Sequence, residues 1–249
     1  MDILVSIKPR VGEVPRLGIP VELDVRGLPN LDEFLPLLAV ELEDLGLRIG
    51  QVRVGYLRRR GDAERFTRLL DYLNVDSMVA RPGADGVDDL AEILDEASMY
   101  GIRVIWEFGV GSVLRTPDEV FGLANNVAPH RVGLALHAAR EGGLRDFVRR
   151  FVELSGYVKT VYFSNKRGGD FGLPIFDGSM DYLRLTKILQ VLRYEDNVVL
   201  HYKPSYYGRY ASDVEVLNTF MNSLGNEAAD RRLVKSLERI VNEVLRQGL

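Results

Sequence analysis

Short runs rich in β-branched residues recur along the chain, and most are followed by a segment with helical spacing of apolar residues. Several runs are almost continuously apolar, which is typical of strands that are covered on both faces. The pattern therefore predicts eight strands, at Ile3–Ile7, Val21–Val25, Gln51–Leu57, Ser77–Ala80, Arg103–Phe108, Arg131–Leu136, Thr160–Ser164 and Asn197–Tyr202.

The segments between these runs carry apolar residues three and four positions apart, the spacing of an amphipathic helix. Thr116 and Pro117, followed by two acids, form a strong helix start, with Thr116 as the N-cap. The predicted helices are Leu31–Leu45, Ala63–Leu73, Val87–Tyr100, Pro117–Val127, Leu144–Ser155, Tyr182–Leu192, Ser212–Leu224 and Asp230–Leu245.

Alternation of strands and helices predicts right-handed βαβ units and a parallel sheet. Eight units within 249 residues favour a closed (β/α)₈ barrel, of the TIM type, over an open doubly wound sheet, which is the alternative. The first unit is irregular because Pro9–Gly18 contains no convincing helix. No linker divides the chain, so residues 1–249 are predicted to form a single domain.

Composition and charge narrow the function classes. The net charge of −4 argues against general attraction to nucleic acid, although a local basic patch stays open. The absence of cysteine excludes disulfides, thiolate metal sites and a cysteine nucleophile. No signal peptide or membrane-spanning run is evident, so we expect a cytoplasmic protein. The lack of cysteine and scarcity of glutamine also suggest a thermophile.

In a barrel of this kind, the residues at the C-terminal ends of the strands face the functional site. The residues there lean basic although the whole chain is acidic. This favours an anionic or polyhydroxylated ligand, since arginine and lysine attract carboxylate and phosphate groups. The predicted substrate-binding residues are Lys8, Glu22, Arg81, Arg140, Asn165 and Lys166.

His137 and His201 each stand at the C-terminal end of a predicted strand, and Glu107 ends another. A lone histidine at such a position is usually a packing residue, but two of them beside a carboxylate also suit catalysis or metal binding. The predicted catalytic residues are Glu107, His137, His201 and Lys203. His130 precedes a strand and is expected to be structural.

Three further segments permit both a functional and a structural interpretation. Gly109–Ser112 resembles a phosphate-binding turn but lacks the full fingerprint. Lys166–Asp170 reads as a charged loop, either a lid or a solvated turn. The tyrosines between Tyr202 and Tyr210 suit stacking on a ligand or covering the barrel rim.

The C-terminal part of the sequence resembles the xylose isomerase-like barrel superfamily, which contains sugar isomerases and epimerases, inosose-type dehydratases and endonuclease IV. The residues that carry the resemblance are Val132–His137, Val161–Asn165 and Gly172–Tyr182. The order and spacing match from about Val104 to Pro204, and the resemblance implies a barrel with a divalent metal site.

This sequence departs from the family at most metal-ligand positions. Glu107 fits the fifth-strand carboxylate. The other positions hold different residues: His137 for an aspartate, Arg140 for a histidine, Tyr162 for a histidine, Asn165 for an aspartate, Gly172 for a loop histidine and His201 for a glutamate. The three-zinc cluster of endonuclease IV needs more histidines and acids, so DNA repair activity is disfavoured.

Two hypotheses remain for the site. In one, Glu107, His137 and His201 bind a divalent transition metal that polarises a sugar carbonyl or hydroxyl, with Lys203 or Glu22 carrying protons. In the other, the metal has been lost, because Arg140 and Lys203 repel a cation. The site then binds a small sugar or anionic metabolite, either as a sugar isomerase or epimerase or as a non-catalytic binding protein. Homo-oligomerisation stays open, and a purely structural role is not favoured by any feature.

Overall fold

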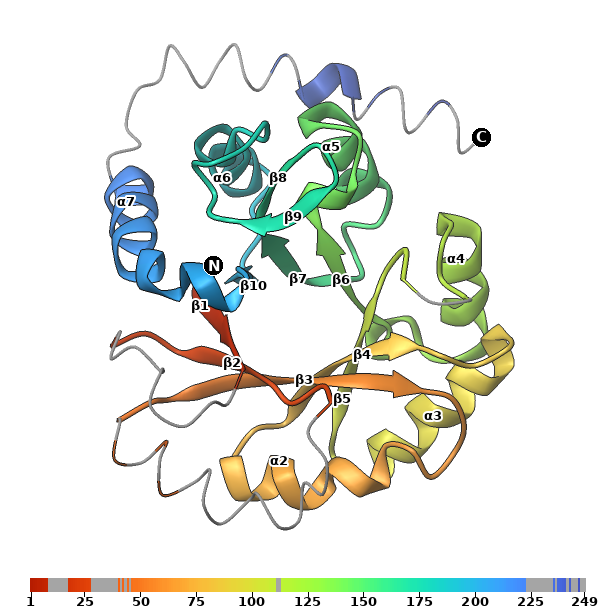
Figure 1. Ribbon diagram of the computed structural model, residues 1–249. Coiled ribbons are helices and arrows are strands. Elements are labelled where there is room, and N and C mark those ends of the chain that lie inside the picture. Colours follow the sequence, from red (N-terminus) through yellow and green to blue (C-terminus); the bar gives the residue numbers. More distant parts are fainter. Residues whose placement is uncertain are drawn as a thin grey trace. The chain divides into compact units, whose positions relative to one another are not determined.

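Parallel strands form the centre of the molecule. The computed structural model describes residues 1–8, 18–27, 40, 42, 44, 46–110, 113–222, 235, 237–240, 242 and 246. Eight strands pair in the order β1-β10-β7-β6-β5-β4-β3-β2 and close into a barrel (Figure 1). They are β1 (Asp2–Ile7), β2 (Val21–Asp24), β3 (Ile49–Leu57), β4 (Ser77–Pro82), β5 (Arg103–Glu107), β6 (Gly133–His137), β7 (Val158–Phe163) and β10 (Asn197–Leu200). The predicted (β/α)₈ barrel is confirmed, with strand ends that differ from the prediction by at most two residues.

Helices follow most of the strands, as the hydrophobic spacing predicted. They are α2 (Thr67–Leu73), α3 (Val87–Met99), α4 (Pro117–Asn126), α5 (Leu144–Glu153), α6 (Tyr182–Val191) and α7 (Tyr210–Asn222). Short 3₁₀ helices lie at Glu64–Phe66, Pro129–Arg131, Ala138–Arg140 and Pro204–Arg209. None of the described helices is long and apolar enough to cross a membrane.

Three predicted segments fall largely outside the described residues: the helices Leu31–Leu45 and Asp230–Leu245, and the connection Pro9–Gly18. Half of the predicted Gly109–Ser112 turn does so as well. One prediction is incomplete: Lys166–Asp170 is not only a loop, because it lies within the antiparallel hairpin of β8 (Asn165–Arg167) and β9 (Asp170–Leu173).

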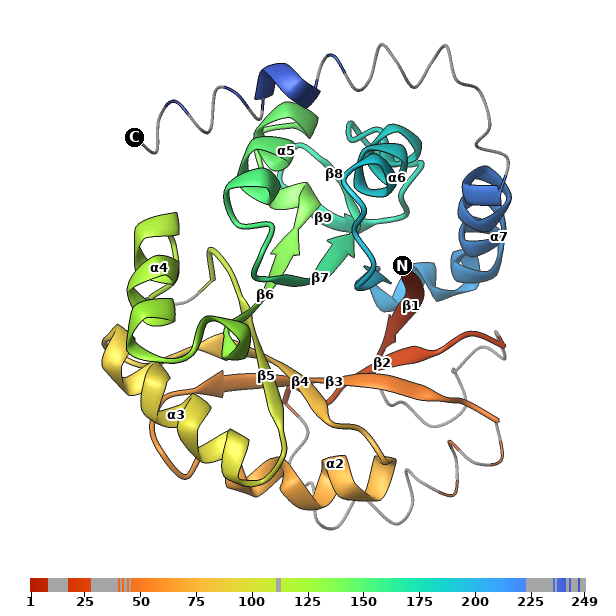
Figure 2. The same ribbon diagram turned by 180° about the vertical axis from the view of Figure 1, so that it is seen from behind.

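The chain divides into two compact units. The N-terminal unit contains residues 4–136 and 157–160, and the C-terminal unit contains residues 1–3, 137–156 and 161–249. Strands β1, β6 and β7 contribute residues to both. In Figures 1 and 2 the N-terminal unit runs mainly from red to green and the C-terminal unit mainly from green to blue, and each is described by itself below.

Strand alternation in the N-terminal unit places polar side chains on one face of the sheet. In the register of β2 and β3, Glu22 pairs with Gln51 and Asp24 pairs with Arg53, and all four residues are buried. Successive side chains of a strand point to opposite faces, so Leu23 and the other intervening apolar residues point away from this polar row. These two strands therefore combine a row of buried polar side chains on one face with apolar side chains on the other.

Candidate functional site

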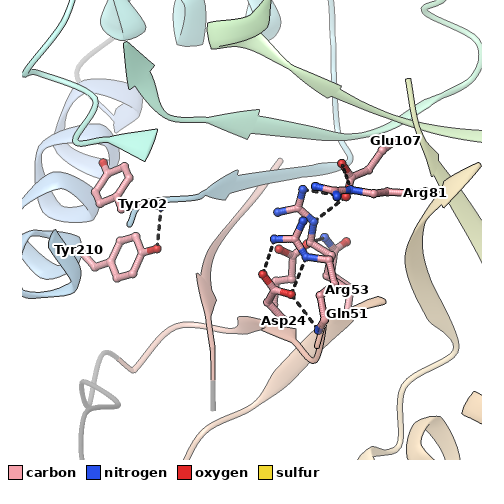
Figure 3. A network of polar contacts seen from close by, with 9 residues as sticks. Asp24, Gln51, Arg53, Arg81, Glu107, Tyr202 and Tyr210 are labelled. Atoms are coloured by element: carbon pink, nitrogen blue, oxygen red, sulfur yellow. Dashed lines mark hydrogen bonds and ion pairs between the residues drawn. The ribbon is translucent and has the colours of Figure 1, made fainter. Parts of the chain in front are cut away.

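The end of β5 carries a buried ion pair. The Nε and Nη2 atoms of Arg53 lie 2.8 and 2.7 Å from Oε1 of Glu107, and both side chains have no exposed surface (Figure 3). Burying a carboxylate away from water costs free energy unless an opposite charge and hydrogen bonds compensate for the lost hydration. Arg53 on β3 supplies both, so the two residues depend on each other.

A second guanidinium reaches the same carboxylate. Nε of Arg81, at the end of β4, lies 3.5 Å from Oε2 of Glu107, and a quarter of the Arg81 side chain is exposed. The Arg81 guanidinium carbon also lies 5.6 Å from the centre of the Tyr56 ring, close enough for a cation–π contact. Arg81 is thus held from the inside while part of it faces solvent.

Two further polar pairs continue the buried row. Asp24 accepts hydrogen bonds of 2.7 and 2.6 Å from Nε and Nη2 of Arg26, a bidentate pair. Burial and the charge of Arg53 lower the pKa of the Arg26 guanidinium, but the hydrogen bonds with Asp24 and the negative charges of Asp24 and Glu107 together leave that pKa above its ordinary value. Glu22 accepts a hydrogen bond of 2.6 Å from Nε2 of Gln51. The Thr160 hydroxyl donates a hydrogen bond of 3.2 Å to Oε1 of the same Gln51 side chain.

The donor set does not fit the predicted divalent metal site. A metal of this class needs carboxylates whose charge is available to it. Both oxygens of Glu107 already face guanidinium groups. Within the part of the chain that the structure describes, no three histidine, aspartate or glutamate side chains gather closely enough to hold a metal ion.

In the C-terminal unit, the two predicted histidines lie around a tyrosine. The ring of His137 stacks on that of Tyr162, with centres 4.3 Å apart and an angle of 11° between the planes. His201 meets both rings edge-on, 6.2 Å from His137 and 5.6 Å from Tyr162. The sequence predicted His137 and His201, and the structure adds Tyr162, whose fixed ring sets the plane of the His137 imidazole.

Two predicted lysines attach the β8–β9 hairpin. Lys166 donates a hydrogen bond of 2.7 Å to the backbone carbonyl of Glu141, and Lys203 forms an ion pair with Asp170. Lys203 also donates its backbone N–H to the carbonyl of Gly172, at 2.9 Å. These contacts give both side chains a structural task in addition to any contact with a ligand.

Glu141 is an acidic residue near this hairpin that the sequence reasoning did not select. Desolvation raises the pKa of its carboxyl above the ordinary value, against the opposing charges of Arg150 and Lys166. It follows the short 3₁₀ helix after β6. A glutamate in a loop gives no sequence signal of its burial, so the pattern could not have identified it.

Asn165 organises the loop that follows β9. Its Nδ2 donates to the carbonyls of Ile175 and Met180 at 2.7 and 3.1 Å. Its Oδ1 accepts from the backbone N–H groups of Lys166 and Met180 at 3.0 and 3.1 Å. The side-chain amide nitrogen and the carbonyl oxygen both bond to backbone groups, so Asn165 positions this loop, and its predicted contact with a ligand stays a prediction.

The tyrosine-rich segment folds on itself. The rings of Tyr202 and Tyr207 both stack on the ring of Tyr210, with centre-to-centre distances of 4.7 Å for Tyr202 and 5.3 Å for Tyr207. The Tyr202 hydroxyl donates to Asp213 at 2.8 Å and accepts from the backbone N–H of Ile175 at 3.2 Å. Of the two interpretations left open, these contacts favour a packing role. Figure 3 shows the hydrogen bond from the Tyr202 backbone to the Tyr210 hydroxyl.

The remaining predicted residues lie at exposed positions. Lys8 follows β1 and Arg140 ends the 3₁₀ helix after β6, and both are exposed. Gly172, at the place of the family's loop histidine, has φ of +79°, and a Cβ there would lie 3.2 Å from Cγ of Lys203. A histidine at this position would therefore be strained as well as crowded.

Comparison with known proteins gives structural relatives only. No protein-family model matches the sequence, and no curated protein sequence matches it. Among solved structures, the probable 3-DHS dehydratase AsbF of Bacillus anthracis, involved in petrobactin synthesis, is 14% identical, with a TM-score of 0.57 over 80% of this chain and 88% of that chain.

Two further structures are similar over most of their length. An L-ribulose 3-epimerase is 14% identical, with a TM-score of 0.57 over 98% of this chain and 96% of that chain. A xylose isomerase-like TIM barrel protein of Mycobacterium smegmatis, in complex with magnesium, is 16% identical, with a TM-score of 0.53 over 83% and 85% of the two chains. At this identity the likeness concerns the fold, and the chain thus shares its barrel with sugar epimerase and xylose isomerase-like proteins.

Proposed function

We propose that this barrel binds a small anionic, polyhydroxylated metabolite at the C-terminal ends of its strands, without a divalent metal. The observation that carries the proposal is the pairing of Glu107 with Arg53 and Arg81. The resemblance described above puts Glu107 at the family's fifth-strand metal carboxylate, and in this chain that buried carboxylate faces two guanidinium groups. The exposed part of Arg81 then offers hydrogen-bond donors in a fork that matches a carboxylate or phosphate.

A matched pair of ligands tests this proposal. D-gluconate and D-sorbitol have the same carbon chain and differ only in a carboxylate against a hydroxymethyl group at one end. Titration calorimetry is expected to show binding of gluconate that is at least tenfold tighter than that of sorbitol. Arg81→Ala should abolish the preference, and Arg81→Lys should restore only part of it because lysine lacks the planar fork.

The exposed Arg59, on the loop after β3, supplies the control. Arg59→Ala removes the same charge near the strand ends and should leave both affinities unchanged. Equal affinities for gluconate and sorbitol across a panel of such pairs would contradict an anion site at Arg81. So would an equal effect of the two alanine variants.

For the reaction, we propose isomerase or epimerase chemistry with the imidazoles of His137 and His201 as proton carriers. The supporting observation is their arrangement around Tyr162, which fixes the plane of the first ring and brings the second to its edge. Histidine exchanges protons near neutral pH, as removal of a proton next to a carbonyl requires. A non-catalytic binding protein is the competing proposal.

Solvent exchange distinguishes these two proposals. The protein is incubated in D₂O with a panel of ketoses, aldoses and their acids, and proton NMR follows loss of signal at the carbon next to the carbonyl. Exchange that disappears in His137→Ala and in His201→Ala supports an enzyme. Binding without exchange in any member of the panel supports the non-catalytic protein.

A further inference from the structure

The C-terminal unit has a concave surface that is lined by helical residues and by none of the described strand residues. A cavity of about 740 Å³ is lined by residues of α5, of α6 and of the C-terminal segment, the last at positions 237, 239, 240, 242 and 246. Its volume is in the range of sites for small molecules. We call this cavity the arginine groove, because of the side chains that line it.

Four arginines contribute to the arginine groove. Arg145 comes from α5, Arg184 from α6, and Arg239 and Arg246 from the C-terminal segment, with Asn242 beside them. Among the described residues, no carboxylate lines the groove. Concentration of four positive charges on a chain with a net charge of −4 is therefore a local feature. Concave surfaces with one sign of charge attract ligands of the opposite sign.

The rest of the lining is aliphatic. Val148, Ile188 and Leu237 are almost completely buried, and Leu144 and Ile240 are partly exposed. We call these aliphatic lining residues the floor of the groove. A ligand for such a surface combines several negative charges with a body that tolerates an apolar contact.

We propose that the arginine groove binds an organic oligophosphate, a molecule with three or more phosphate charges joined to a nucleoside-sized body. Four guanidinium groups match the three to four charges of a triphosphate, and the planar fork of arginine pairs with phosphate oxygens at two points. The aliphatic floor accommodates the body. This site is separate from the strand-end residues of the proposed function and does not depend on them.

Three probes separate the contributions of charge and body. ATP carries both, inorganic tripolyphosphate carries only the charge, and adenosine carries only the body. Isothermal titration of the full chain is expected to give the tightest binding for ATP, weaker binding for tripolyphosphate and none for adenosine. Affinity for ATP should fall steeply with added salt, because the phosphate contacts are electrostatic.

Charge-reversal variants locate the site. Arg184→Glu and Arg239→Glu change exposed side chains, so we expect them to fold, and each should weaken ATP binding at least tenfold. Arg68→Glu, at an exposed position of α2, is the matched control and should bind ATP as the unmodified chain does. Thermal unfolding without ligand checks that all three variants are equally stable.

Several outcomes would overturn the proposal. Equal losses in Arg68→Glu and in the groove variants would show that binding is a diffuse charge effect. Binding of tripolyphosphate as tightly as ATP would assign the site to inorganic polyphosphate and remove the role of the floor. Absence of ATP binding at low salt would exclude the oligophosphate site.

Discussion

At the scale of single residues, the buried pair of Arg53 and Glu107 shows how charge is tolerated within the barrel. Each side chain is completely buried, and each compensates the other. The pair was not predictable as a pair, because residues 53 and 107 are joined only when β3 and β5 are placed by the fold. The sequence did predict that Glu107 lies at the C-terminal end of an apolar strand.

The first prediction concerns this pair. Glu107→Gln removes the charge that compensates Arg53 and should lower the free energy of unfolding by about 3–5 kcal/mol, the range for breaking a buried ion pair. The double variant Arg53→Met with Glu107→Leu should recover much of this loss, since neither buried charge remains. Urea unfolding followed by circular dichroism measures both. A double variant no more stable than Glu107→Gln would contradict the compensation.

Glu141 allows a prediction about pH. Desolvation raises the pKa of its carboxyl in the folded protein, so the folded state binds this proton more tightly than the unfolded state. Its contribution to stability is therefore fully present below the unfolded pKa and is lost as pH rises through the folded pKa. Glu141→Gln should be more stable than the unmodified chain at pH 7, and the difference should shrink towards pH 4.

Melting temperatures across this pH range test the sign. A constant difference between Glu141→Gln and the unmodified chain at all pH values would contradict the raised pKa.

At the scale of elements, the helix start at Thr116 was predicted from local sequence alone. The Thr116 hydroxyl accepts from the backbone N–H of Glu119 at 3.4 Å, and the Glu119 carboxylate accepts from the Thr116 N–H at 2.9 Å. This reciprocal capping involves residues three apart, so the chain needs no distant partner to form it. A local contact of this kind makes the start of α4 predictable from the sequence.

Loss of the cap should be measurable. Thr116→Ala removes the hydroxyl that caps α4 and is expected to lower stability by about 1 kcal/mol. Thr116→Ser keeps the hydroxyl and serves as the control. Chemical denaturation of the two variants gives the comparison, and equal losses in both would contradict a capping role.

The loop after β9 is the opposite case, because its order depends on distant residues. Asn165 bonds to backbone groups up to 15 residues away, and a Cβ at Gly178 would lie 2.3 Å from its Oδ1. The sequence could not predict these hydrogen bonds of Asn165, because its backbone partners come close only in the folded chain. The β8–β9 hairpin was missed for a similar reason, as Gly168 and Gly169 resemble a solvated turn.

This loop gives a fourth prediction. Asn165→Ala leaves the N–H and C=O groups of Met180 without their partner and should lower stability by about 1–3 kcal/mol, the cost of buried unsatisfied groups. It should also speed hydrogen exchange within residues 175–180. Unchanged exchange there, measured by mass spectrometry, would contradict the positioning role.

At the scale of the whole molecule, strands β1, β6 and β7 each contribute to both compact units. If residues 1–249 form a single domain, as the sequence predicts, we expect both units to unfold together in one cooperative transition. Trp106 is the only tryptophan, is fully buried and belongs to the N-terminal unit, so its fluorescence reports that unit. Its transition should coincide with that of far-ultraviolet circular dichroism, and separate midpoints would instead indicate two domains.

The metal content is the second property of the whole molecule to test. Because Arg53 and Arg81 face Glu107, we expect elemental analysis of the purified protein to find well under one divalent metal per chain. Chelator treatment should leave the melting temperature unchanged. One tightly bound transition metal per chain, lost in both His137→Ala and His201→Ala, would instead support the metal hypothesis drawn from the sequence.

The mutual dependence of Arg53 and Glu107 also constrains how this sequence can drift. Replacing Glu107 alone removes the carboxylate that pairs with Arg53, and replacing Arg53 alone removes the shortest ion pair of Glu107, so a lineage passes through a less stable protein before the second change arrives. Descendants should therefore retain both residues or have exchanged both. In a future alignment of true homologues, positions 53 and 107 are expected to covary more strongly than the exposed arginines around them.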